Sequence, residues 1–214
     1  MNLTKTSDVL EATSLALNNT QNDPTIGARM EAYGLSAAAI QTGKRLLKTL
    51  EQKTIIQDKL QQKRWALSQQ INASLLATRD QFKEHAQLSL VAFRHDTALI
   101  HALKIERIAS RRWECVRQAA YFYQEFRNRK LSLAPLGVSP KDIQRIHDNV
   151  TELLRLKEDR VYKKGISEQN TQEKNQAQAE LREWLLEFRA IARAAFRHQP
   201  QLLEMFGMKV GARV

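Results

Sequence analysis

The sequence predicts an all-α protein made of long helices, and three observations support this. Only seven Gly and four Pro occur in 214 residues, so few positions interrupt a helix. Residues that form helices readily, such as Ala, Leu, Gln, Glu, Lys and Arg, are abundant. No stretch alternates apolar and polar residues with a period of two, so we expect no β-strand.

A four-residue motif, Ala-Phe-Arg-His, occurs at 92–95 and again at 195–198, an offset of 103 residues. The same offset aligns the Gly-Leu-Ser at 34–36 with the Gly-Val-Ser at 137–139. Across 34–105 the offset gives 14 identities, about three times the number expected from composition. We therefore predict a duplicated helical unit, with copies at 34–105 and 137–208, whose two hairpins form an antiparallel four-helix-type bundle.

Residues 1–33 are expected to form short helices before the first copy. Ser7 and Asp8 precede an apolar stretch and provide a helix N-cap. The segment 18–24 is rich in Asn, Asp and Pro, which favour turns, and it should separate the first helix from a second. Thr25 can cap that second helix, which should reach Tyr33.

The first copy should begin at Ser36, whose hydroxyl can accept hydrogen bonds from free N–H groups of the first helical turn. We expect a reversal near 61–63 and a return helix that ends at His95. A long joining helix should then run over 97–130, since Asp96 and Thr97 can cap it. One apolar face of this helix is expected to contact its neighbours.

The second copy should begin at Pro140, a favourable residue for the first turn of a helix. Gly165 is expected to mark its reversal. Residues 167–180 include no large apolar side chain, and their Gln, Glu, Lys and Ala content favours a solvated helix over a loop. Gly207 should end a last short helix, followed by a tail over 209–214. The whole is expected to be one compact domain.

The formal net charge is +11, and the segment 104–130 carries 8 basic and 3 acidic residues. Such a chain is attracted to nucleic acid and to anionic surfaces. A single cysteine, Cys115, excludes an intramolecular disulfide. The first residues have no apolar stretch of signal-peptide type, and no run of 18 apolar residues occurs, so we expect a cytoplasmic protein without membrane insertion.

Basic and aromatic residues are interleaved in the predicted joining helix, which suits phosphate contact and base stacking. These candidate contacts for a partner or for nucleic acid are Arg107, Arg111, Arg112, Trp113, Arg117 and Tyr121. Three acidic residues, Glu106, Glu114 and Glu125, lie among them and would neutralise part of the field. A solvated or partner-facing helix surface is the simpler interpretation.

The repeated helix-end motif has two interpretations as well. Its members are Phe93, Arg94 and His95 in the first copy and Phe196, Arg197 and His198 in the second. In the simpler one, Phe anchors the last turn of a helix, and Arg and His complement the negative end of the helix dipole. In the other, the motifs form a symmetric pair of sites for an anion or a partner.

No pattern predicts catalytic residues, a cofactor or a metal. The five histidines include no pair spaced i, i+4, and no Glu-x-x-His motif occurs. Glycine-rich phosphate loops and nucleophile motifs are also missing. We therefore predict a non-enzymatic helical module that binds itself as a homo-oligomer or binds another protein. Nucleic-acid binding is the alternative, and a metal-binding or enzymatic bundle is third.

Overall fold

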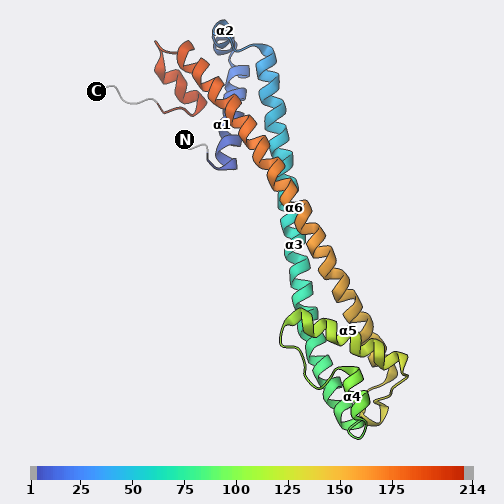
Figure 1. The fold of residues 1–214 in the computed structure, drawn as a ribbon. Coiled ribbons are helices and arrows are strands. Elements are labelled where there is room, and N and C mark those ends of the chain that lie inside the picture. Colours follow the sequence, from blue (N-terminus) through green and yellow to red (C-terminus); the bar gives the residue numbers. More distant parts are fainter. Residues whose placement is uncertain (1–3, 210–214) are drawn as a thin grey trace. The chain divides into compact units, whose positions relative to one another are not determined.

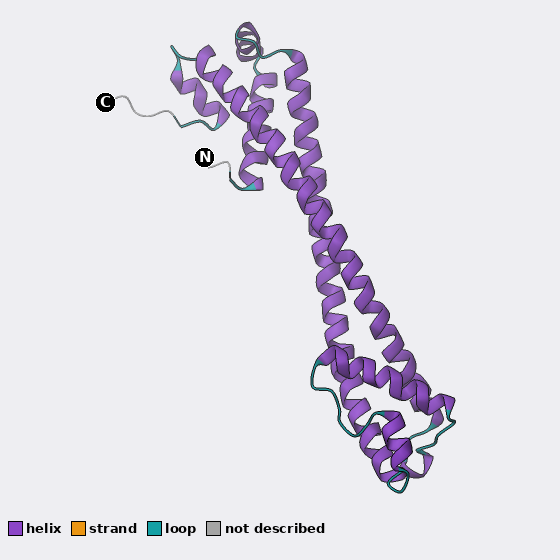
Figure 2. Cartoon of the chain, in the orientation of Figure 1, coloured by secondary structure: helices purple, strands orange, loops and turns teal. Residues whose placement is uncertain are grey.

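The computed structural model describes residues 4–209, and within this range it contains helices and no β-strand (Figure 2). The all-α prediction is therefore confirmed. In chain order the elements are α1 (Thr6–Asn22), α2 (Pro24–Ala32), α3 (Ala37–Ala92), α4 (Thr97–Leu103), α5 (Arg112–Asn128), η1 (Ala134–Leu136), α6 (Pro140–Ala195) and η2 (Pro200–Phe206) (Figure 1).

Instead of one compact domain, the chain divides into two compact units. Residues up to Gln61 and from Ile166 onward form the first unit, and Gln62–Gly165 form the second. The long helices α3 and α6 each contribute a part to each unit. Each unit has its own hydrophobic core.

The core of the second unit is aromatic. Phe82 from α3 packs against Phe122 from α5, with ring centroids 5.5 Å apart, and Phe122 in turn packs against Phe126 at 5.4 Å. All three side chains are fully buried, as is Tyr123. Aromatic pairs in such tilted geometries contribute about 0.5–1.5 kcal/mol beyond the area they bury.

The core of the first unit combines large side chains of α6 with small ones of α1. Phe188 packs against Trp184 and against Phe206 of η2, with ring centroids 5.5 Å and 5.3 Å apart. On α1 the buried residues include Ala12 and Ala16. Small residues let helices approach closely, and the aromatic rings of α6 and η2 pack together in the same core.

The predicted reversals at 61–63 and at Gly165 are wrong, because both positions lie inside uninterrupted 56-residue helices. The two copies are therefore not hairpins. Residues 61–63, Gln-Gln-Lys, form helices readily. Gly165 is exposed, with no atom within 4 Å of the position of a Cβ, and one helical glycine costs only about 1 kcal/mol relative to alanine.

The predicted joining helix over 97–130 is also wrong, since α4 ends at Leu103 and α5 begins only at Arg112. Lys104 has φ +53°, a left-handed conformation that ends α4. The Gln118 side chain then satisfies the backbone of the intervening loop. It accepts from the Ala109 N–H at 2.8 Å and donates to the Arg107 carbonyl at 2.9 Å and to the Lys104 carbonyl.

The helix ends agree better with the sequence. Ser36 accepts from the Ala39 N–H at 3.1 Å, and Asp96 accepts from the Leu99 N–H at 2.8 Å, as predicted. Gly207 has φ +65° and follows η2, and residues 167–180 are helical. Two caps differ. Asp23, rather than Thr25, caps α2. Helix α1 begins at Thr6 after Lys5 and has no side-chain cap, so the predicted cap at Ser7 and Asp8 is wrong. Of the predicted tail over 209–214, all but Lys209 lies outside the described residues.

Candidate functional site

The basic and aromatic candidates lie on the loop 104–111 and on the first half of α5, in the second unit. Part of the set lines one open cavity of about 810 Å³: Arg107 from the loop and Arg117 and Tyr121 from α5. His101 and Lys104, which no sequence pattern singled out, add an ionisable and a positively charged group. Because Gln118 holds the loop backbone, the cavity has a defined wall.

This cavity is not purely basic. Glu106 and Glu114 also line it, so the expected local neutralisation is present in the structure. The Lys104 ammonium lies over the Tyr121 ring, 4.2 Å from its centroid, which occupies one aromatic face that a base could stack on. The arrangement suits an anionic group with hydrogen-bonding capacity better than a stack of bases.

The other three candidates, Arg111, Arg112 and Trp113, lie in different environments. Arg111 is paired with Glu114, with 3.3 Å between nitrogen and oxygen. Arg112 lines another cavity, together with Arg79 of α3. Trp113 is half-buried, and the Lys157 ammonium of α6 lies 4.9 Å from its ring centroid. The six residues therefore do not form one continuous binding surface.

The repeated helix-end motif has the same local geometry in both copies. In each, the Arg Nε donates to the Nε2 of the following His, at 2.9 Å for Arg94 and 2.8 Å for Arg197. The two phenylalanines differ: Phe93 is half-buried, whereas Phe196 is buried beneath the Arg29 guanidinium. His95 and His198 are exposed. A shared anion or partner site at these motifs stays a prediction.

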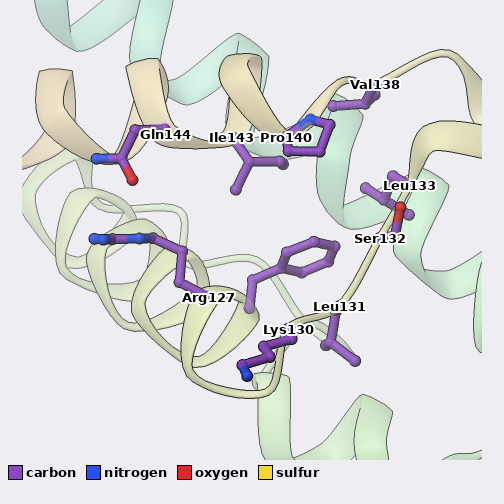
Figure 3. A pocket seen from close by; sticks show the side chains of 10 residues that line it. Arg127, Lys130, Leu131, Ser132, Leu133, Val138, Pro140, Ile143 and Gln144 are labelled. Atoms are coloured by element: carbon purple, nitrogen blue, oxygen red, sulfur yellow. The ribbon is translucent and has the colours of Figure 1, made fainter.

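A cavity of about 260 Å³ lies between α5, the segment after it and the start of α6 (Figure 3). Phe126, Leu133 and Ile143 form part of its apolar wall, while Arg127 and Lys130 contribute positive charge. The Arg127 guanidinium is 3.2 Å from His147 Nδ1 and is thus already engaged. No sequence motif marks this cavity, because its lining comes from three segments that only the fold brings together.

A buried polar pair joins α3 to α5 in the second unit. The Tyr123 hydroxyl is hydrogen-bonded to His85 Nδ1 at 3.1 Å. Burial lowers the pKa of His85 and raises the pKa of Tyr123, so both are neutral near pH 7. Spacing along a single helix does not predict this pair, because His85 and Tyr123 lie on two different helices that the fold brings together.

Two arginines have buried nitrogens without a hydrogen-bond partner. In the first unit, Arg189 is only 8% exposed, and its Nε and one Nη are unpaired. Burial, with a further contribution from Arg193, lowers the pKa of Arg189. In the second unit, the Nε of Arg79 is buried and unpaired. Unpaired buried donors are uncommon in folded proteins and call for a specific explanation.

Over residues 4–209, no group of three or more His, Cys, Asp or Glu side chains is placed to hold a metal ion. Cys115 is a free thiol in the core of the second unit, and burial raises its pKa. In the same part of the chain, none of the helices has the length and hydropathy needed to cross a bilayer.

Comparisons with protein-family models, with curated proteins and with solved structures gave no match.

Proposed function

We propose that this chain is a non-enzymatic helical binding and assembly module that associates with itself or with another protein. Large exposed apolar side chains on the long helices carry the proposal. In the second unit Trp65, Val161 and Tyr162 are 68%, 67% and 69% exposed. In the first unit Ile55 and Ile56 are exposed as well. Exposed tryptophan and tyrosine are the residues most enriched at the energetic centres of protein interfaces.

The mass of the protein in solution, measured by sedimentation over a range of concentrations, tests this proposal. We expect the wild-type mass to rise from 24.6 kDa toward a multiple of it as concentration increases. Trp65→Ser with Tyr162→Ser should hold the protein at the monomer mass. Tyr33→Ser is the matched control, since Tyr33 is an exposed tyrosine outside the long helices. An unchanging monomer mass for the wild type contradicts self-association, and equal masses for both variants contradict the assigned residues.

We further infer that the chain arose by duplication, and the element bounds support this. At the 103-residue offset Ala37–Ala92 coincides with Pro140–Ala195, and Thr97–Leu103 coincides with Pro200–Phe206. The residues after the short helices, Lys104 and Gly207, both have positive φ. The repeated unit would then be one long helix followed by one short helix, not a hairpin.

Nucleic-acid binding is the second candidate, favoured by the cavity that Lys104, Arg107 and Arg117 line. Fluorescence anisotropy of a labelled single-stranded oligonucleotide, at low and at physiological salt, tests it. Binding should weaken steeply with salt and be lost in Arg107→Glu with Arg117→Glu. Arg111→Glu is the control, because Arg111 lies outside the cavity and is paired with Glu114. The same affinity for both variants would contradict this assignment.

A further inference from the structure

A cavity of about 240 Å³ in the second unit has a composition unlike the other two. Its lining consists of Asn72, Leu75, Leu76 and Arg79 of α3 and Arg112 of α5. No acidic residue is among them. Two positive charges therefore meet at one cavity without a lining carboxylate to balance them.

Neither of these guanidinium groups is paired elsewhere. Within residues 4–209, the side chains of Arg79 and Arg112 have no hydrogen bond or ion pair, and the Nε of Arg79 is buried. The Arg79 charge also opposes the rise in the pKa of the Cys115 thiol of α5, which places the guanidinium near that helix. A buried N–H without a partner destabilises the protein when no acceptor is supplied. An anionic ligand would supply the missing acceptor.

The rest of the lining is apolar. Leu75 is buried in the core, whereas Leu76 is 63% exposed and remains open to a ligand. An inorganic anion alone would leave Leu76 in water. A ligand that carries an apolar arm would cover it, since burial of apolar surface is favourable.

We propose that this cavity binds a small organic carboxylate with a short apolar arm. The carboxylate accepts from Arg79 and Arg112, whose planar groups suit it, and the arm lies against Leu75 and Leu76. The volume of about 240 Å³ corresponds to roughly eight water-sized groups. Hexanoate has this size and serves as the probe. Such a ligand would give the assembly module a small-molecule site that is independent of the exposed apolar residues proposed for association.

The duplicated sequence supplies a matched control. At the 103-residue offset, Arg79 and Asn72 correspond to Arg182 and Asn175, which are the same residue types on α6. Both residues of that second pair are exposed. Arg182→Gln therefore removes an identical side chain from a long helix without touching the cavity.

Equilibrium dialysis of the full chain against radiolabelled hexanoate tests the proposal. We expect hexanoate to bind saturably at one site with a dissociation constant of about 1 mM or lower. Acetate and hexanamide should each bind this site at least about tenfold more weakly than hexanoate. Arg79→Gln and Arg112→Gln should each weaken hexanoate binding by about tenfold or more, and Arg79→Lys by less. Leu76→Ser should weaken it by roughly threefold. Arg182→Gln and Arg117→Gln should have no effect.

Arg112 is exposed, so its variant should keep the fold even if the Arg79 variant does not. Far-ultraviolet circular dichroism checks whether each variant is folded. The proposal is overturned if hexanoate does not bind saturably, or if Arg112→Gln binds it as well as the wild type. Equal binding of acetate and hexanoate would show an anion site without the apolar arm, which also contradicts the proposal. Sedimentation of the same variants distinguishes this site from the association surface.

Discussion

Replacing Gly43 by alanine should destabilise the protein, against the usual rule for helices. Gly43 lies inside α3, where alanine normally adds about 0.5–1 kcal/mol of stability. Here the new Cβ would lie 2.4 Å from Cζ2 and 2.5 Å from Cε2 of Trp184 on α6. Both distances are far inside van der Waals contact, so the ring or the helix must move.

The Trp184 ring is held on two sides. Its Nε1 donates to the Ala39 carbonyl at 2.9 Å, and its ring packs against Phe188 with centroids 5.5 Å apart. Overpacking of a core costs about 1–3 kcal/mol. A displaced ring also loses its hydrogen bond, which contributes about 0.5–1.5 kcal/mol. After subtraction of the helix-propensity gain, we expect Gly43→Ala to lower the free energy of unfolding by about 1–3 kcal/mol.

Urea unfolding followed by far-ultraviolet circular dichroism measures this change. Gly165→Ala is the control: it is also a glycine inside a long helix, no atom lies within 4 Å of its Cβ position, and it should gain about 0.5–1 kcal/mol. In a Trp184→Leu background the penalty of Gly43→Ala should disappear, because the smaller side chain leaves room for the methyl group. A Gly43→Ala protein as stable as the wild type would refute the reasoning.

Three further variants test other parts of the structure by urea unfolding. Arg189→Leu should raise the free energy of unfolding by about 1–3 kcal/mol, since it removes two buried unpaired donors and keeps the apolar volume; a loss of stability would mean that the guanidinium has a partner. Ser139→Ala should cost about 1 kcal/mol, because the Ser139 hydroxyl caps α6 by accepting from the Asp142 N–H at 3.2 Å; no loss would contradict that role. Replacing both His85 and Tyr123 by phenylalanine should flatten the pH dependence of stability below about pH 6.5.

The sign of that pH effect follows from the protonation of His85 in the two states. Its pKa is lowered in the folded protein by burial, with smaller opposing effects of Glu84 and Asp142. Below pH 6.5 the unfolded chain therefore binds a proton that the folded chain does not, and stability falls as the pH falls. The expected slope is at most about 1.4 kcal/mol per pH unit. A slope unchanged in the double variant would contradict this assignment.

Helix ends were predictable because their signals are local. A serine or aspartate hydrogen-bonds an N–H group two or three residues away, and Ser36 and Asp96 do so in the structure. The loop 104–111 was not predictable in this way. It depends on Gln118, which bonds backbone groups up to 14 residues away and offers no signal in sequence. Local propensity favoured a continuous helix there, and tertiary hydrogen bonds prevailed.

The candidate site was likewise predictable only where its signals are local in sequence. Charge density in 104–130 drew attention to that segment, and Arg107, Arg117 and Tyr121 line one cavity in the structure. The separation of Arg112 from them, and its meeting with Arg79 of α3, required knowledge of how two helices pack. Spacing along one helix describes which residues share a face, but it does not describe what the next helix contributes.

The close fit of Gly43 to Trp184 also bears on whether one long helix could replace the other. At the 103-residue offset, Gly43 corresponds to Ile146, and Trp184 corresponds to Gln81. A chain that used the second long helix in both places would set an isoleucine against the indole, and one that used the first twice would leave the glycine facing a glutamine. Exchange of either long helix for the other would therefore lose the fit between Gly43 and Trp184.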